Sequence, residues 1–388
     1  MTTTVTPPSA TAAAPAAVSP TPGAAGVVTV DAAATSGTQP VILAVDGNSL
    51  VHRSFHANAG AAHRLPRGPG GVPGWAVRGL LTQLAAAVLR ACADAIVVGF
   101  DDPDASERRV RWPHYKAQRA PKPPGLVSQL ELAVEVLRDL GLAVVVPAGL
   151  EADDVLASVC AQAPALGART VVMTSDRDAF ALVGEHTRLL RVINGGVEAS
   201  PMLDPDRAEM VTGVRPEQYR DLAALRGDPS DNLPGVRGVG PKRATLLLRE
   251  FGSAAAAFAA ATDEPERCGR IVGPAVARAL ADPQALARWQ DNCDVMAMRA
   301  DVAVDLDLSA AATGRLPLPV DVVEHVYRRW ELPPAAALRA LCGVEPREPQ
   351  PADVAASWRP PAAYSRPRHP PLRRRGVDTS GIMQETLF

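Results

Sequence analysis

Short apolar runs alternate with longer amphipathic stretches between residues 41 and 192. The short runs occupy residues 41–45, 95–100, 142–146 and 170–174. In the stretches between them apolar residues recur every three or four positions, as in residues 77–90, 127–140 and 153–161. Strand-like runs that alternate with helical patterns are typical of βαβ units. The pattern therefore predicts an α/β fold with a mostly parallel central sheet flanked by helices.

The second half of the chain has a different pattern. Residues 201–299 show helical periodicity with Pro, Gly and Asp at the breaks, and residues 318–343 have the pattern of terminal helices that pack on the core. Residues 102–124 are polar, basic and punctuated by proline, which predicts an excursion from the core. We therefore expect an α/β core at residues 40–200 and a helical region at residues 201–345.

The two ends of the chain are compositionally biased. Residues 1–39 consist mainly of Ala, Pro, Thr and Ser, and residues 346–388 are rich in Pro and Arg. Such segments cannot bury enough apolar surface to offset the entropy of ordering. We expect both ends to be disordered tails.

Composition narrows the class of protein. The net charge of -2 means that any basic surface must be local. The five cysteines lie far apart without a C-x-x-C pair, which argues against a zinc site or a disulfide framework and fits a reducing compartment. Residues 1–52 lack the basic residues of a signal peptide, and the longest apolar stretch, around residues 80–98, contains Arg90 and Asp94. We expect a soluble, cytoplasmic, monomeric protein.

Carboxylates stand where the strand-like runs end. The carboxyl ends of parallel strands share one edge of a sheet, so these side chains should converge there. Like charges about 4 Å apart repel by ~4 kcal/mol at an effective dielectric near 20, and hard divalent cations such as Mg²⁺ or Mn²⁺ relieve that repulsion. The sequence predicts a metal-dependent phosphoryl-transfer site built from Asp46, Asp101, Glu151, Asp153, Asp154, Asp176, Asp178, Asp228 and Asp231.

Each of these acids also has an ordinary structural interpretation. Asp46 and Asp101 are typical helix caps or turn residues, and acids in the first turn of a helix, as at residues 151–154, interact favourably with the helix dipole. Asp176 and Asp178 are two residues apart, so an extended backbone would direct both at one ion. Only the joint occurrence of the acids, in order and at matching positions, favours a metal site.

Four sequence motifs resemble those of the 5′-nuclease (flap endonuclease) family. They are Val45-Asp-Gly-Asn-Ser with Arg53-Ser-Phe-His56, Gly149-Leu-Glu-Ala-Asp-Asp-Val-Leu-Ala157, Thr174-Ser-Asp-Arg-Asp178, and Gly227-Asp-Pro-Ser-Asp-Asn-Leu-Pro-Gly-Val-Arg-Gly-Val-Gly-Pro-Lys242. The similarity is greatest to the 5′→3′ exonuclease domain of bacterial DNA polymerase I and covers residues 41–343. It implies a helical arch on the sheet and a metal-dependent nuclease that cuts branched or 5′-ended DNA.

The resemblance also implies roles for the acids. All nine fall on the family's metal-binding positions, and two ions per site are expected. Asp46, Asp101, Glu151, Asp153 and Asp154 would serve one ion, and Asp176, Asp178, Asp228 and Asp231 the second. Two ions about 3.5–4 Å apart can activate water and neutralise a phosphate in an in-line displacement.

Residues 102–124 match the family's arch, and we keep that name for the segment. By resemblance Lys116 and Arg119 face the scissile phosphate, and on a helix they would share a face. Tyr115 would be available to stack on a base. Arg53 and Arg108 match positions near the cut. The alternative is a solvated basic helix without a catalytic role.

Two positions depart from the family pattern. His52 replaces the aromatic residue, usually Tyr, that precedes the Arg, which puts base stacking there in doubt. The loop at residues 60–74 is longer and richer in Gly and Pro than expected, which would alter substrate threading rather than chemistry.

A glycine-rich stretch after the last two acids resembles a helix-hairpin-helix. Backbone N–H groups at a helix N-terminus can contact DNA phosphates without reading sequence, and nearby cations add to the attraction. The alternative is an ordinary glycine-rich turn. The residues expected to bind DNA are Gly235, Arg237, Gly238, Gly240, Lys242 and Arg243.

The C-terminus suggests a partner. No polymerase domain follows, so we expect a free-standing protein. Gln384, Leu387 and Phe388 are similar to the peptide with which bacterial proteins bind the sliding clamp, and arginines at residues 359–375 would add non-specific DNA affinity. A tail that only confers solubility is the alternative.

The sequence therefore predicts a structure-specific 5′ nuclease of replication or repair, associated with the nucleoid. A nuclease-dead, clamp-linked DNA adaptor and a PIN-like ribonuclease are the alternatives. The sequence leaves open the preference for 5′ ends or flaps, for RNA primers or DNA, and the identity of the metal.

Overall fold

The computed structural model describes residues 39–58, 60 and 68–344. The expected tails lie outside this part of the chain, apart from Gln39, and so does the predicted clamp-binding peptide with Gln384, Leu387 and Phe388. The loop at residues 60–74 is described only in part. The predictions made for these segments remain predictions.

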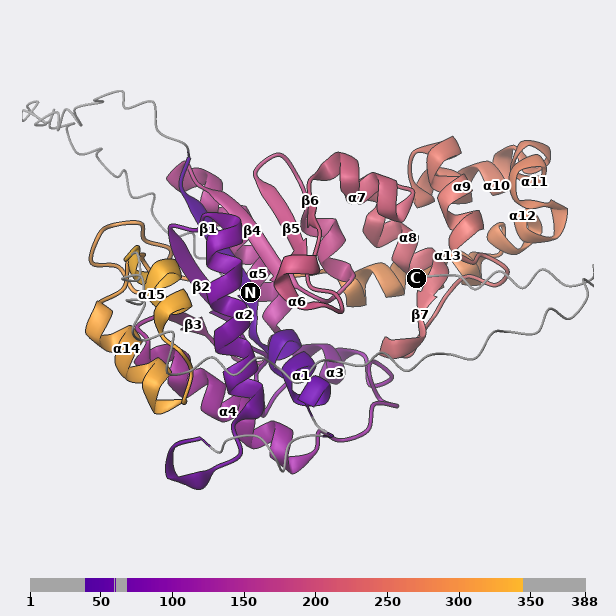
Figure 1. The fold of residues 1–388 in the computed structure, drawn as a ribbon. Helices are drawn as coiled ribbons and strands as arrows, with labels where there is room; N and C mark the ends of the chain where they lie inside the picture. The colour runs from indigo at the N-terminus through magenta and orange to yellow at the C-terminus, as the bar shows by residue number, and fades with distance from the viewer. Residues whose placement is uncertain (1–38, 59, 61–67, 345–388) are drawn as a thin grey trace, which may run out of the picture. The chain divides into compact units, whose positions relative to one another are not determined.

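A six-stranded sheet forms the centre of the fold, in the order β3-β2-β1-β4-β5-β6 (Figure 1). The first five strands are parallel and β6 is antiparallel to β5. Their bounds are β1 (Val41–Asp46), β2 (Ala95–Gly99), β3 (Ala143–Val145), β4 (Arg169–Thr174), β5 (Thr187–Arg191) and β6 (Met202–Leu203). The predicted fold class, a mostly parallel sheet flanked by helices, is confirmed.

The strand order places a topological switch point beside β1. The chain passes from β1 to β2 and β3 on one side, and then returns to form β4 and β5 on the other side. In open α/β sheets, such a switch point leaves a crevice at the carboxyl ends of the two strands, where ligands bind. Here those ends carry Asp46 on β1 and Asp176 just after β4.

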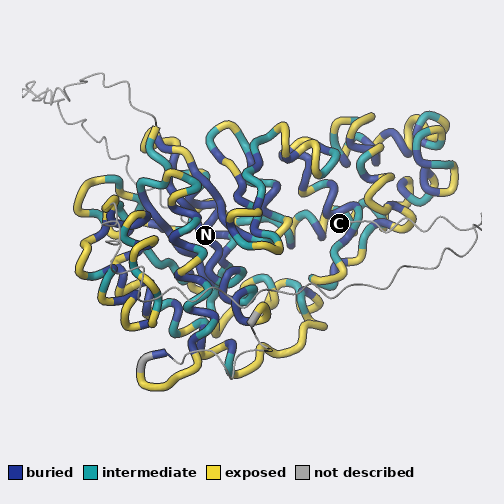
Figure 2. Tube along the Cα trace, in the orientation of Figure 1, coloured by how far each residue is buried: buried dark blue, intermediate teal, exposed yellow. Residues whose placement is uncertain are grey.

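Both faces of the sheet are buried, as expected for parallel strands covered by helices (Figure 2). Successive residues of β1 contact different apolar cores: Ile42 and Ala44 one, Leu43 and Val45 the other. The flanking helices are α1 (Gly47–Asn58), α2 (Trp75–Ala91), α4 (Pro124–Asp139), α5 (Ala152–Gln162) and the short α6 (Gly196–Ala199). Short 3₁₀ turns are η2 (Pro69–Gly71), η3 (Ala163–Leu166) and η4 (Asp178–Leu182).

The second half of the chain is helical, as its pattern predicts. Its elements are α7 (Pro205–Thr212), η5 (Pro216–Gln218), α8 (Tyr219–Arg226), η6 (Pro229–Asp231), α9 (Pro241–Phe251), α10 (Ala254–Asp263), α11 (Pro265–Val272), α12 (Pro274–Leu280) and α13 (Pro283–Met296). Figure 1 shows α9 to α12 grouped beyond the edge of the sheet. A two-stranded ribbon of β7 (Gly227–Asp228) and β8 (Leu233–Pro234) precedes them.

The last described helices pack back on the core. They are α14 (Val320–Arg329) and α15 (Ala335–Cys342), beside α2 and α4. The Tyr327 hydroxyl donates to the carbonyl of Leu81 over 2.8 Å. The Trp330 ring covers Gly68 and Gly74, where any Cβ atom would overlap it. Within the described residues, no helix combines the length and the apolar character that a membrane crossing requires.

Candidate functional site

The predicted acids gather at the carboxyl edge of the sheet, around the switch point. Asp46 ends β1, Asp101 follows β2, and Glu151 to Asp154 form the N-terminus of α5. Asp176 and Asp178 follow β4. Asp228 and Asp231 flank η6, where the helical region approaches the same edge. Side chains from distant parts of the sequence therefore meet in one region, where most of them fall into an unpaired or a paired group.

Asp46 belongs to the acids that have no cationic partner within the described residues, and it is only 5% exposed. Its carboxylate accepts hydrogen bonds from the Ser49 backbone N–H over 2.8 Å and from the Thr174 hydroxyl over 2.6 Å. Burial raises the pKa of Asp46 to about 7, and the charges of Asp101 and Asp176 raise it further against those hydrogen bonds. Removal from water disfavours the charged form of the carboxyl group, and the two neighbouring carboxylates add to that effect.

Two further acids of this group, Asp153 and Asp178, feel the charge of Asp176. Burial, followed by the charges of Asp176 and Asp46, raises the pKa of Asp153 well above its ordinary value. Burial also raises the pKa of Asp178 to about 7, with Asp176 and Asp228 adding to the effect. We call Asp46, Asp153, Asp176 and Asp178 the unpaired acids.

The backbone around Asp176 differs from the expected extended strand. Asp178 begins the 3₁₀ turn η4, and its N–H donates to Asp176 Oδ1 over 2.9 Å. The expectation that the two side chains project alike from an extended segment is therefore wrong. The chain turns here because Asp176 itself accepts the hydrogen bond that starts the turn.

Three other acids each contact a cation of the arch, and we call Glu151, Asp154 and Asp231 the paired acids. Asp154 is fully buried and accepts two hydrogen bonds from the Arg108 guanidinium, at 2.7 and 2.8 Å. Glu151 lies 3.1 Å from Lys116 Nζ and 3.3 Å from Arg108 Nη1. These side chains satisfy one another without a metal ion.

Arg119 contacts the third paired acid. Its Nη2 forms an ion pair with Asp231 Oδ1, and its Nε donates to the Ser230 carbonyl over 3.2 Å. Burial raises the pKa of Asp231, whereas Lys116 and Arg119 lower it. Lys116 and Arg119 therefore both contact carboxylates of the acidic edge, and their predicted role towards a phosphate stays a prediction.

The arch does not hold these cations on a helix. It contains only the short helix α3 (Glu107–Arg111), followed by consecutive turns in which Lys116 adopts a left-handed conformation with φ 55°. The Lys116 N–H donates to the Asp231 carbonyl over 2.9 Å, which ties the turn to η6. The expected helical spacing of Lys116 and Arg119 is wrong, and a residue other than Gly in this conformation marks a local constraint.

Two other arch expectations also change. Tyr115 is buried, at 5% exposure, in a small cluster with Leu233 and Val295, and its hydroxyl donates to Glu151 over 3.1 Å. The expectation that its ring is free to stack on a base is wrong. Arg53 lies on α1, and its buried Nε has no hydrogen-bond partner within the described residues.

Asp101 has mixed surroundings. It accepts from the Asn48 side chain over 2.6 Å and from the Ala152 N–H over 3.0 Å, and Lys122 Nζ lies 4.0 Å away. It therefore joins α1 to the N-terminus of α5 while it faces Asp46. Sequence reasoning missed the supporting polar residues Asn48 and Thr174, although both belong to the motifs that carry the resemblance.

The predicted DNA-binding residues span the loop between β8 and α9 and the first turn of α9. Gly238 has φ 79°, and Gly240 is the N-cap of α9. Arg237 and Lys242 are exposed, whereas Arg243 donates to the Gly238 carbonyl over 2.9 Å. Gly235 serves packing, because a Cβ atom there would lie 2.2 Å from the Arg226 carbonyl oxygen. Their contact with DNA stays a prediction.

The donors at the edge suit a hard divalent cation. The unpaired acids offer only oxygen ligands, and bound cations would offset both the burial and the neighbouring charges that raise the pKa values of Asp46, Asp153 and Asp178. Within the described residues, no three His, Cys, Asp or Glu side chains converge tightly enough to form a complete set of direct ligands. Mg²⁺ keeps several waters in protein sites, so it can bind through a few direct carboxylates and water bridges.

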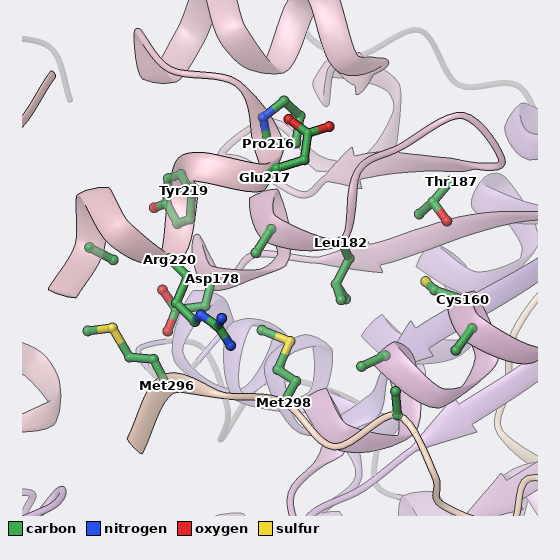
Figure 3. Close-up of a pocket in the computed structure, with 15 residues that line it drawn as sticks. Cys160, Asp178, Leu182, Thr187, Pro216, Glu217, Tyr219, Arg220, Met296 and Met298 are labelled. Carbon is green, nitrogen blue, oxygen red and sulfur yellow. The ribbon is translucent and has the colours of Figure 1, made fainter. Parts of the chain in front are cut away.

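A separate cavity of about 440 Å³ lies behind Asp178 (Figure 3). Its wall combines apolar side chains, including Leu182, Met296 and Met298, with the polar residues Glu217 and Arg220. Asp178 is thus a boundary between this cavity and the acidic edge. The cavity is distinct from the edge on which the predicted site residues meet.

Comparisons with known proteins show which families and proteins the chain is similar to. The profile of the 5′-3′ exonuclease N-terminal resolvase-like domain matches residues 41–212, and that of the 5′-3′ exonuclease C-terminal SAM fold matches residues 214–316. DNA polymerase I of Mycobacterium bovis is 37% identical over 227 residues, which are 58% of this chain and 25% of that protein. DNA polymerase I of Chloroflexus aurantiacus is 32% identical over 277 residues, or 71% of this chain and 28% of that protein. The chain thus spans about a quarter of the length of these relatives.

Solved structures also share parts of the architecture. The T5 5′-exonuclease with zinc bound aligns with 66% of this chain and 100% of its own, at 20% identity and a TM-score of 0.47. The catalytic core of Rad2 in complex with a DNA substrate aligns with 78% of this chain and 92% of its own, at 15% identity and a TM-score of 0.49.

Proposed function

The chain belongs to the 5′-3′ exonuclease family, and we propose that it is a metal-dependent nuclease that hydrolyses phosphodiester bonds in DNA at 5′ ends or 5′ flaps. The observation that carries the proposal is the meeting of unpaired acids with the cations of the arch at the switch point of the sheet. The charge of Asp176 helps to raise the pKa values of Asp46 and Asp153 there, and Lys116 lies on the same edge.

The unpaired acids would hold the divalent cations, with Asp101 and Asp228 beside them. Bound cations of this kind supply an activated water and neutralise charge on the phosphate. Two ions, and Mg²⁺ as the physiological metal, belong to this proposal. The division of the carboxylates between the ions stays a prediction, and Asp154 already pairs with the Arg108 guanidinium.

The chain's own cations have a complementary task. Lys116 and Arg119 lie opposite the unpaired acids, held by Glu151 and Asp231. A phosphate drawn to the edge would be neutralised from both sides, and fixed cations stabilise the charge that develops during hydrolysis. The N-terminus of α9, with Lys242, would bind duplex phosphates without reading sequence.

A cleavage assay with paired substrates tests this function. We expect the chelated protein to leave a labelled 5′-flap duplex and a blunt duplex intact, and added Mg²⁺ to restore cleavage. The preferred substrate then distinguishes flap endonuclease from exonuclease activity. Cleavage of an RNA flap alone would favour the PIN-like alternative, and tight DNA binding without any cleavage would favour the adaptor. Cleavage that persists in EDTA would contradict the proposal.

Asp176→Asn provides the matched variant. Removing its charge without changing its size should lower kcat by about 1,000-fold with DNA binding retained, because the ions lose a ligand. Glu209→Gln, an exposed acid on α7, is the control and should leave kcat unchanged. Equal activity of the two variants would remove the acidic edge from the reaction. Clamp binding through Gln384, Leu387 and Phe388 stays a prediction.

A further inference from the structure

Asp154 and its neighbour Asp153 have different surroundings. Asp153 is partly exposed among other acids, whereas Asp154 is fully buried beside a guanidinium. Successive residues of a helix point about 100° apart, so the two carboxylates leave α5 in different directions. Asp153 faces the other unpaired acids, and Asp154 faces Arg108 on α3 of the arch.

All the acceptor positions of Asp154 are used. Its Oδ1 accepts from Arg108 Nη2 over 2.7 Å and from the Arg299 N–H over 2.8 Å. Its Oδ2 accepts from Arg108 Nη1 over 2.8 Å and from the Glu151 N–H over 3.0 Å. A carboxylate has about four lone-pair sites, so none remains for an ion. The adjacent guanidinium would also repel a dication.

The donors of Arg108 are used in the same way. Besides Asp154, it donates through Nε to the Val295 carbonyl over 3.1 Å and through Nη2 to the Ala297 carbonyl over 2.8 Å. Those carbonyls belong to the C-terminus of α13, where a cation satisfies acceptors that the helix leaves free. Burial alone would lower the pKa of Arg108, but Asp154 and Glu151 outweigh it, so the group stays charged.

The pair therefore joins three segments that are distant in the sequence. They are α3 of the arch, the N-terminus of α5, and residues 297–302, which we call the strap. The strap is held again one turn along α5, where the Ser158 hydroxyl accepts from the Val302 N–H over 3.0 Å while it donates to the Asp154 carbonyl over 2.7 Å. Arg108 also touches Glu151, the carboxylate that holds Lys116.

We propose that Arg108 and Asp154 are a positioning pair: Asp154 holds Arg108 rather than an ion, and Arg108 fixes the arch so that Lys116 faces the acidic edge. The inference rests on the proposed function, because it assigns the pair to the placement of a cation used in phosphodiester hydrolysis. It departs from the expectation that Asp154 is a metal ligand and Arg108 a catalytic residue.

Substitutions at the adjacent positions 153 and 154 of the full-length chain test the inference, because it predicts opposite effects on metal affinity and on hydrogen exchange. Mn²⁺ is titrated into Asp153→Asn and Asp154→Asn and followed by electron paramagnetic resonance, and hydrogen exchange is measured without metal. Asp153→Asn should lower Mn²⁺ affinity about tenfold or more, as expected for a lost ligand, with exchange unchanged. Asp154→Asn should retain Mn²⁺ affinity, while exchange rises in both α3 and the strap.

Kinetics separate positioning from general support of the fold. Arg108→Met should lower kcat about tenfold at unchanged KM, but by less than about twofold when Lys116→Met is already present, because Arg108 acts through Lys116. Full additivity of the two substitutions would contradict the inference. If Asp154→Asn does not fold, Arg108→Met decides: raised exchange in α3 and the strap with Mn²⁺ affinity kept supports the inference, and unchanged exchange overturns it.

The outcomes also separate this inference from the proposed function. A loss of Mn²⁺ affinity in Asp154→Asn as large as that in Asp153→Asn would overturn the positioning role and leave the nuclease proposal intact. A wild-type chain that binds no Mn²⁺ at all would overturn the proposed function, and with it the inference that depends on it.

Discussion

The acidic edge has two sides, and the carboxylates on them have different roles. On one side Glu151, Asp154 and Asp231 are neutralised by cations of the arch. On the other side Asp46 and Asp153 lie among acids, and their pKa values are raised. The difference teaches that a carboxylate's task is set by the direction of its side chain and not by its place in a motif. The paired acids stabilise the fold, and the unpaired acids carry negative charge that a bound cation would neutralise.

Stability measurements should separate the two sides most strongly. Arg108→Met leaves Asp154 buried without its cation, so it should lower the free energy of unfolding by about 3–5 kcal/mol. Asp153→Asn should raise that free energy in the metal-free protein, because it removes repulsion. Urea unfolding in EDTA measures both. If both substitutions shift the free energy of unfolding in the same direction, the distinction between paired and unpaired acids is wrong.

Removing the cation that faces the unpaired acids should have the next largest effect. Lys116→Met should lower kcat by about 100-fold, or ~2.7 kcal/mol, because a fixed positive charge near the phosphate is lost. Arg109→Met, at an exposed position of the same arch, serves as the control and should change kcat little. A similar loss in both variants would indicate that only the net charge of the arch matters. Single-turnover cleavage of a flap substrate measures both rates.

The pH dependence of stability should identify the unpaired side. The pKa of Asp46 is raised by burial from an ordinary 3.8 to about 7. The unfolded chain therefore loses this proton first, and the stability present below pH 4 is lost as the pH rises past 7, with on the order of 2.5 kcal/mol of that loss between pH 5 and pH 8. Saturating Mg²⁺ should restore stability at pH 8 but not at pH 5.

The control for this profile is Asp46→Asn. Burial also lowers the pKa of His52 to about 4, which makes stability fall as the pH falls and opposes the effect of Asp46. Thermal melting of both proteins from pH 5 to 8 isolates the acid, since His52 is common to them. Parallel profiles would show that Asp46 does not titrate in this range.

The smallest effect is expected away from the edge, at the N-terminus of α9. Lys242→Ala should weaken binding to duplex DNA by about 1 kcal/mol, reduce the salt dependence by about one ion and leave kcat unchanged. Fluorescence anisotropy at several salt concentrations measures this. An unaltered salt dependence would indicate that the duplex does not contact Lys242 at the N-terminus of α9.

The sequence predicts the frame of the site better than its contacts. The runs at residues 41–45 and 170–174 form β1 and β4, because apolar periodicity reports local burial. The pairing of Arg108 with Asp154 could not be found in this way, since the strap that completes it is more than a hundred residues distant in sequence. The left-handed Lys116 was missed for a similar reason: a long-range hydrogen bond to Asp231 overrides the local helical spacing.

Diffraction from crystals grown with Mn²⁺ and a chelated control tests the central claim most directly. An anomalous difference map locates the ions without reference to activity. The account predicts density on the unpaired side, among Asp46, Asp153 and Asp176, with Arg108 still bound to Asp154. Density coordinated by Asp154, or none beside the unpaired acids at saturating Mn²⁺, would contradict it.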